Sequence, residues 1–424
     1  MHQHKVWVVG MGVVSSLGDL NSIWYGLLAG KSGVAHNHFT TFRRVHESYD
    51  PAEDGLENTI AAEVLDFDPL DYMDKKDARR MDPVSQFAMA AAQPAFARSG
   101  LRITSELADR TGVFIGTGEG GLSTLEYQYH RLKSGGSRRV SPLLIPMVMP
   151  NAAADHVASS YGLHGPSDTY AAACASGIVA IGEAFRKIRN GEIDAAFAGG
   201  SEAVITPTCV SGFRNMHALS PRTNNPQCRS RPFDQDRDGF VMGEGAGMLI
   251  LVSAELGVAQ GLVPLAEIVG YGRTRDGHHI TEPHPQGIYA IKAVEQALRD
   301  ARIGTDEVVY INPHGTGTPL NDGCEAAVYR RIFGEERAAK IPISSSKSML
   351  GHAIGAAGAI ETVICVLTIM NGRAHSTINL DTVALECEGL DYIRGTPREI
   401  PRGAVLNTAF GFGGENAALI LAPF

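Results

Sequence analysis

The chain has 424 residues, of which 44% are hydrophobic and 20% are charged, as is typical of a folded enzyme. Its formal net charge of −9 argues against a nucleic-acid-binding protein, because such proteins usually carry a basic excess. No run of about 18 uninterrupted apolar residues occurs, so the sequence predicts no membrane span. The six cysteines contain no CxxC pair, which favours reduced thiols and a cytoplasmic location.

Short apolar runs that end in glycine alternate along the chain with amphipathic stretches. The first run, VWVVGMG, predicts a strand and a turn. The polar stretch 36–82, which mixes acidic and basic residues, predicts a segment on the surface of the protein. Apolar residues at helical spacing from Ile178 to Ile188 predict a helix that follows Cys174 and ends at Asn190. Residues 288–301 predict another helix, followed by the strand EVVYIN. This alternation favours an α/β fold.

Cys174 is a candidate nucleophile. In DTYAAACASGIVAIGEAF it lies between a β-leaning run and the predicted helix. Unpaired N–H groups and the dipole at a helix start favour a thiolate. The alternative is a buried structural cysteine in a small-residue packing site, which is the commoner role of a lone cysteine.

Three further segments carry residues suited to the same chemistry. VVYINPHGTGTPLND places His314 between a strand and a Gly/Thr-rich turn, and NTAFGFGGENAALIL places Phe412 between two strand-like runs. ISSSKSMLGHAIGAAGAIE holds Lys347, His352 and Glu361. A single histidine would usually be a satisfied core residue. Together with Cys174, however, two imidazoles supply a nucleophile and hydrogen-bond donors for an oxyanion.

All four segments, in their order along the chain, resemble the β-ketoacyl-acyl-carrier-protein synthases, most closely the synthase II type of ketosynthase. The resemblance extends over nearly the whole chain, including RRMDPVSQFAMAAA and RPFDQDRDGFVMGEGAGMLIL. It implies an α/β, thiolase-like fold in which two pseudo-equivalent halves form a layered α-β-α-β-α sandwich. Residues 1–262 would form the half with the nucleophile, and residues 263–424 the half with both histidines and the GFGG loop.

The resemblance also implies a function. Cys174 would take an acyl group from the phosphopantetheine arm of an acyl carrier protein, and the N–H groups of Cys174 and Phe412 would bind the oxyanion. His314 and His352 would stabilise the enolate formed when malonyl-carrier protein loses CO2. This decarboxylative Claisen condensation extends the chain by two carbons in fatty-acid-type synthesis. No bound cofactor is expected.

The family pattern assigns supporting roles to other residues. Lys347 and Glu361 match a buried charged pair that orients the second histidine. Thr316 and Thr318 match threonines that bind the pantetheine amides, and Phe412 matches a gate at the acyl pocket. Phe213 and Phe410 are expected beside the acyl chain, although Phe213 is equally well explained by core packing. No metal-binding motif and no dinucleotide fingerprint occur.

An acidic carrier protein needs a basic docking surface on this chain. The candidates are the basic residues Lys75, Lys76, Arg79, Arg80, Arg138, Arg139 and Arg214. A charge run can equally be a solvated face. The partners implied are this carrier protein and either a second copy of the chain or a chain-length-factor-like subunit.

Two features depart from the synthase II pattern. Glu119 stands where an apolar residue usually lines the acyl pocket, and a carboxylate beside a saturated tail is costly unless it is paired or solvated. The loop HGTGTPLND resembles polyketide synthases at its second glycine. The alternative function is therefore the ketosynthase of a type II polyketide or polyene pathway. A non-catalytic partner subunit is disfavoured, since Cys174 and both histidines are present.

Overall fold

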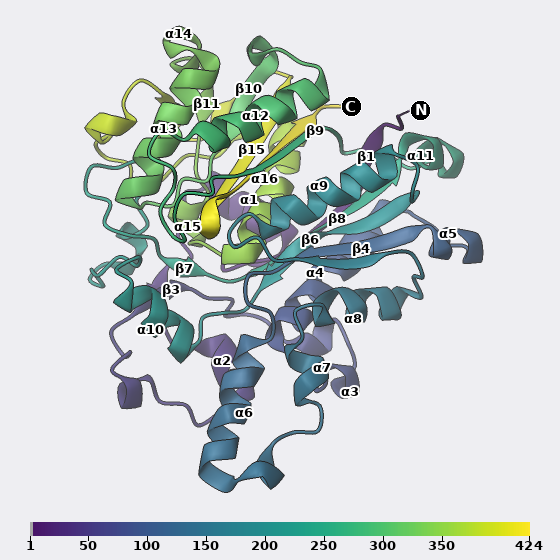
Figure 1. The fold of residues 1–424 in the computed structure, drawn as a ribbon, viewed down its shortest axis with the longest axis vertical. Helices are drawn as coiled ribbons and strands as arrows, with labels where there is room; N and C mark the ends of the chain where they lie inside the picture. The colour runs from purple at the N-terminus through teal and green to yellow at the C-terminus, as the bar shows by residue number, and fades with distance from the viewer. Residues whose placement is uncertain (1–2) are drawn as a thin grey trace.

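The computed structural model of the protein describes residues 3–424, and a single large sheet runs through it (Figure 1). In spatial order its strands are β13 (Asp391–Tyr392), β11 (Pro342–Ile343), β10 (Val308–Asn312), β15 (Ala404–Gly411), β16 (Glu415–Ala422), β9 (Ala266–Arg275), β1 (Val6–Val14), β8 (Gly245–Ser253), β6 (Ala195–Glu202), β4 (Thr111–Gly116) and β5 (Ser167–Tyr170).

The strand order repeats on the two sides of this sheet. Outward from the middle, one side runs β1, β8, β6, β4, β5 and the other runs β9, β16, β15, β10, β11. Successive pairings are antiparallel, antiparallel, parallel and parallel on both sides. The thiolase-like fold of two pseudo-equivalent halves is therefore confirmed. The expected division at residues 262 and 263 lies in the loop before β9 and stays a prediction.

The two sides of the sheet meet through a short antiparallel ladder. It consists of three residue pairs, in which Val6–Val8 of β1 lie opposite Ala266–Ile268 of β9. Helices therefore provide most of the contact between the halves. The helices α9 (Ser176–Arg189) and α16 (Ala357–Asn371) pack against each other and against strands of both halves.

Helices form the outer layers as well (Figure 1). The helices α4 (Pro83–Ser99) and α8 (Ala152–Tyr161) cover one half-sheet, and α12 (Ile288–Ala301) covers the other, with α13 (Pro319–Phe333) packed beside it. The helices and the strand predicted after Cys174 and at 288–312 agree with α9, α12 and β10. The layers confirm the expected sandwich.

The central position of α16 explains its composition. Residues Ile354–Asn371 are long and apolar enough to cross a membrane, yet 83% of this stretch is buried inside the protein. A helix enclosed by other elements is apolar on all its faces. Packing in the core therefore accounts for this apolar stretch, which also contains Glu361.

The remaining elements are shorter or lie outside these layers. The other strands are β2 (Ala35–His36), β3 (Ile60–Ala62) and β7 (Met242–Gly243), which form one small sheet, and β12 (Arg373–Ala374) and β14 (Arg398–Glu399), which form another. The other α-helices are α1 (Leu20–Leu28), α2 (Thr40–Val45), α3 (Lys75–Ala78), α5 (Ser105–Asp109), α6 (Leu122–Gly135), α7 (Leu144–Val148), α10 (Pro207–Asn215), α11 (Ala254–Gln260), α14 (Glu335–Ala338) and α15 (Lys347–Leu350). The 3-10 helices are η1 (Pro51–Asp54), η2 (Pro69–Asp71), η3 (Ser137–Arg139), η4 (Pro226–Cys228), η5 (Thr305–Glu307), η6 (Ile354–Ala356), η7 (Leu385–Cys387) and η8 (Phe412–Gly414).

The close contact between β4 and the first turn of α9 gives a test of this packing. A Cβ on Gly116 would lie 2.3 Å from the backbone of Ser176, so Gly116→Ala should destabilise the protein by about 1–3 kcal/mol through overpacking. Gly212→Ala is the matched control, because its Cβ meets no atom within 4 Å and alanine favours a helix. Urea unfolding measures both, and equal stability of the two variants would contradict this packing.

Candidate active site

Cys174 lies at the entrance to α9, on a tight turn that follows β5. Ala173, just before it, has a φ of 47°, a left-handed conformation that is strained for a residue other than glycine. The Ser176 Oγ accepts the N–H of Ala172 at 2.8 Å and lies 2.7 Å from the carbonyl oxygen of Ala173, to which it can donate. These contacts hold the turn, and Cys174 is buried at its end.

The fold brings both predicted histidines to this thiol. The Nε2 atom of His352 lies 3.0 Å from the Sγ atom of Cys174. The rings of His314 and His352 are 5.2 Å apart and nearly perpendicular. Three residues that are far apart in the sequence therefore meet in one buried cluster, and two of them come from the opposite half of the molecule.

Backbone hydrogen bonds fix the segment that carries His352. Its N–H donates to the carbonyl of Val241 at 2.7 Å, and its carbonyl accepts the N–H of Gly243 at 2.9 Å. The ring of His352 packs edge-on against Phe240 at 5.4 Å. The short strand β7 thus places this imidazole from the other half of the chain.

Two buried carboxylates on α13 hold the loop that carries His314. Glu325 accepts the N–H groups of His314 at 2.6 Å and Gly315 at 2.7 Å, and Asp322 accepts the N–H of Thr316 at 3.1 Å. The two acids are three residues apart, so they lie on the same face of the helix. Neither acid was predicted from the sequence, although two acids spaced for one helix face directly after the histidine loop were an available signal.

Burial sets the protonation states of the cluster. The pKa values of His314 and His352 are well below their usual value, because burial disfavours the charged ring and Lys347 adds a nearby positive charge. Burial raises the pKa of Cys174 to about 11, although Lys347 and the N–H of Phe412 oppose this shift. The helix start favours a thiolate, and desolvation opposes this effect. Burial thus favours a protonated thiol and two neutral imidazoles.

Lys347 and Glu361 form a buried ion pair near the histidines, as the family pattern implies. Burial raises the pKa of Glu361 to about 7, and the charge of Lys347 opposes this rise. The Oε2 atom of Glu361 has no hydrogen-bond partner. The pair supplies the positive charge that acts on all three residues of the cluster without touching Cys174.

The GFGG loop lies directly over the nucleophile turn. Gly411 is so close that an added Cβ would lie 3.0 Å from the backbone nitrogen of Cys174. The N–H of Phe412 faces the thiol, and its ring lies 6.4 Å from that of Phe213. The ring of Phe410 lies 6.3 Å from that of His314. These three aromatic residues are half-buried around the cluster.

The two threonines of the histidine loop lie side by side. The hydroxyls of Thr316 and Thr318 are 3.0 Å apart, with Thr316 buried and Thr318 partly exposed at the start of α13. A line of hydroxyls that runs from a buried cluster toward the surface suits an extended polar ligand. Their assignment to the pantetheine amides stays a prediction.

Glu119 lies on the loop before α6, and its side chain is exposed in the single chain. The same loop is held by the buried carboxylate of Glu202, which accepts the N–H of Gly118 at 2.6 Å and the N–H of Gly355 at 2.9 Å. Glu202 thus ties the Glu119 loop to the segment after His352. Glu202 and Phe240 were also not predicted from the sequence, although the glutamate that follows the glycine pair in AFAGGSEA was a usable signal for Glu202.

The candidate docking residues are all exposed but lie on separate elements. Lys75 and Lys76 belong to α3, and three aspartates at positions 71, 74 and 77 are interspersed with them. The remaining candidates are Arg79 and Arg80 just after α3, Arg138 and Arg139 of η3, and Arg214 of α10. The three aspartates reduce the local positive charge around α3, and docking of the carrier protein on these residues stays a prediction.

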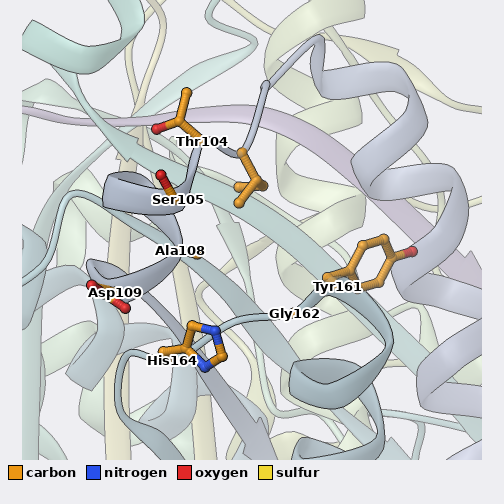
Figure 2. A pocket seen from close by; sticks show the side chains of 8 residues that line it. Thr104, Ser105, Ala108, Asp109, Tyr161, Gly162 and His164 are labelled. Atoms are coloured by element: carbon orange, nitrogen blue, oxygen red, sulfur yellow. The ribbon is translucent and has the colours of Figure 1, made fainter.

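An open hollow of about 510 Å³ lies between α5 and the end of α8 (Figure 2). Its lining includes Thr104, Ser105, Asp109, Tyr161 and His164. None of the predicted site residues lines it. The hollow is therefore separate from the cluster around Cys174.

The raised pKa of Cys174 predicts how the thiol reacts. Between pH 7 and pH 10 its thiolate fraction, and so its alkylation by iodoacetamide, should rise about tenfold for each pH unit. Mass spectrometry of the Cys174 peptide measures the rate, and Cys174→Ala removes the adduct. A rate that is already constant above pH 8 would show a thiol with a much lower pKa.

The Lys347–Glu361 pair is expected to act on the thiol through its charge. Lys347→Met alone should lose about 3–5 kcal/mol of stability, since it leaves the Glu361 carboxyl group buried without a partner. The double variant Lys347→Met/Glu361→Leu should regain most of this loss. Its Cys174 should nevertheless be alkylated more slowly at pH 8, because the cation that lowers the thiol pKa is gone. Unchanged alkylation in a stable double variant would indicate a purely structural pair.

Known proteins resemble this chain over its full length. The family models described as beta-ketoacyl synthase, N-terminal domain and C-terminal domain match residues 3–256 and 265–381. A 3-oxoacyl-[acyl-carrier-protein] synthase 2 of Coxiella burnetii is 41% identical over 423 residues, which cover 100% of this chain and 99% of the relative.

Solved structures agree with this result. A type II polyketide ketosynthase, in complex with its acyl-carrier protein and bound to the hexaketide, matches with a TM-score of 0.88 and 31% identity. The ishigamide ketosynthase/chain length factor matches with a TM-score of 0.89 and 32% identity. Each match covers 100% of both chains. The chain therefore belongs to the β-ketoacyl synthase family.

Proposed function

We propose that the protein is an acyltransferase that condenses malonyl-carrier protein with an acyl group held on Cys174. The observation that carries this proposal is the buried cluster in which the Cys174 thiol lies 3.0 Å from His352, with His314 beside it. Full-length identity of 41% to a 3-oxoacyl-[acyl-carrier-protein] synthase 2 supports the same reaction. The roles of the individual residues below are part of the proposal.

The first half-reaction transfers the acyl group to Cys174. The thiol sulfur attacks the carbonyl of the acyl-pantetheine thioester, the old carbon–sulfur bond breaks, and the thiol proton ends on the pantetheine sulfur. His352 is placed to relay that proton through its Nε2 atom. The N–H groups of Cys174 and Phe412, which both face the thiol, would stabilise the oxyanion.

The second half-reaction forms the new carbon–carbon bond. Malonyl-carrier protein loses CO2, and the electron pair left behind forms a thioester enolate. A neutral imidazole carries one N–H, so His314 and His352 can each donate to the enolate oxygen. One such preorganised donor lowers a barrier by about 2.7–4 kcal/mol in a documented case. The enolate carbon attacks the Cys174 thioester, and the released thiolate takes up one proton.

Other residues would position the substrates. Lys347 and Glu361 would hold and polarise the histidines, and Thr316 and Thr318 would bind the pantetheine arm. Phe412 would act as the gate, with Phe213 and Phe410 beside the acyl chain. The arm belongs to the acyl carrier protein, which is therefore the partner and carries the substrate.

The pathway is proposed to be fatty-acid-type elongation, in line with the named relative. The ketosynthase of a polyketide or polyene pathway is the second candidate, favoured by the two solved structures and by Glu119. In both cases a second chain is expected, either another copy or a chain-length-factor-like subunit. Exposed apolar side chains on α6 and α7, including Tyr129 and Ile145, are available to such a partner. A cytoplasmic location fits six cysteines that are all free.

Acyl loading tests the proposed function. Purified protein exposed to saturated acyl-carrier proteins should gain the mass of one acyl group on Cys174, and Cys174→Ala should gain none. Intact-mass measurement detects the adduct. Loading of polyene or aryl chains alone would support the second candidate, and the absence of any adduct would reject Cys174 as the nucleophile.

Glu119 should influence which chains are accepted. If its carboxylate faces the acyl tail in the assembled enzyme, Glu119→Ile should raise the rate of loading with long saturated chains by about tenfold or more, because burying a charge beside an alkyl chain is costly. Glu57→Ile, at another exposed position, is the control. Equal chain preference in Glu119→Ile and wild-type protein would show that Glu119 does not line the acyl pocket.

A further inference from the structure

The Cys174, His314 and His352 cluster has a second chemical property besides acyl transfer. Its thiol sulfur and one nitrogen of each imidazole all lie within 4.8 Å of one another. All three side chains are buried. Across residues 3–424, no other group of three cysteine, histidine or acidic side chains is spaced in this way. We propose that the unacylated protein binds one thiophilic divalent ion, such as Zn²⁺, at these three residues.

The spacing is close to that of a tetrahedral site. Zinc bonds of about 2.3 Å to sulfur and 2.0–2.1 Å to nitrogen place the ligand atoms roughly 3.3–3.6 Å apart. Cys174 Sγ and His352 Nε2 are now 3.0 Å apart, and no ligand distance exceeds 4.8 Å. Side-chain shifts of roughly 1 Å would therefore complete the geometry. Three protein ligands leave the fourth position for a water molecule.

The ligand set determines which ions can bind. One thiolate and two neutral imidazoles suit Zn²⁺, Co²⁺ and Cd²⁺, whereas Mg²⁺ and Ca²⁺ require oxygen ligands that this set lacks. Binding breaks the S–H bond of Cys174 and forms a metal–sulfur bond, and the proton leaves to solvent. The ion pair with Glu361 offsets part of the positive charge that Lys347 places near the ion.

Metal binding and acylation use the same sulfur atom. A thioester sulfur has no proton to exchange for a metal, so an acyl group on Cys174 excludes the ion, and the ion excludes the acyl group. The ion would thus inhibit the unacylated protein reversibly, whereas the acylated protein would not bind the ion. The sequence shows no metal motif because the ligands come from three segments, which the fold alone brings together.

Cobalt binding tests this site without any assay of activity. Co²⁺ added to the metal-stripped, unacylated protein should give one equivalent of binding and a near-ultraviolet charge-transfer band from cobalt–thiolate ligation. Affinity should fall at least about tenfold in Cys174→Ala and in His352→Ala. Cys209→Ala, which removes a different half-buried thiol, should bind like the wild type.

Chemical blocking supplies a control that does not depend on the folding of a variant. Wild-type protein alkylated at Cys174 should lose the band, and a chelator should restore alkylation of metal-treated protein. The absence of the band in wild-type protein, or an equal band in alkylated protein, would overturn the proposal. Because the readout is metal binding, this result is independent of whether the protein condenses acyl chains.

Discussion

The contact between the Cys174 thiol and His352 is the interaction on which the rest of the site depends. The thiol stands on a strained turn at the start of α9, and the imidazole stands on a segment of the other half that pairs with β7. The ladder between β1 and β9 contains three residue pairs, so the 3.0 Å contact also depends on the close packing of α9 and α16 between the two half-sheets. Glycines such as Gly116 and Gly411 permit the close backbone approaches that this packing demands.

Burial gives the cluster its chemical character. It favours neutral imidazoles and raises the pKa of the thiol. The buried charged residues near the cluster have partners of their own. Lys347 pairs with Glu361, while Asp322 and Glu325 are satisfied by backbone N–H groups of the histidine loop. A neutral, preorganised cluster suits a reaction in which negative charge develops only on an oxygen of the substrate.

The sequence predicted the elements with strong patterns and the residues with reactive side chains. The helix after Cys174 and the strand before His314 follow from periodicity, and the four ordered motifs predicted both the fold family and the members of the cluster. A helix start, which favours a thiolate, is visible in the sequence, whereas the desolvation that raises the thiol pKa depends on residues from distant segments. Glu202 and Glu325 were missed although each had a local sequence signal, because their burial against backbone N–H groups depends on distant segments of the chain.

The condensation step itself tests the central claim most directly. Wild-type protein loaded with one acyl group on Cys174 is mixed with malonyl-carrier protein, and CO2 and the mass of the carrier-bound product are measured over a single turnover. One CO2 and one β-ketoacyl product, two carbons longer than the acyl group, are expected for each loaded Cys174, with little of either from His314→Ala or His352→Ala. Full product formation without either histidine, or from Cys174→Ala, would contradict the account.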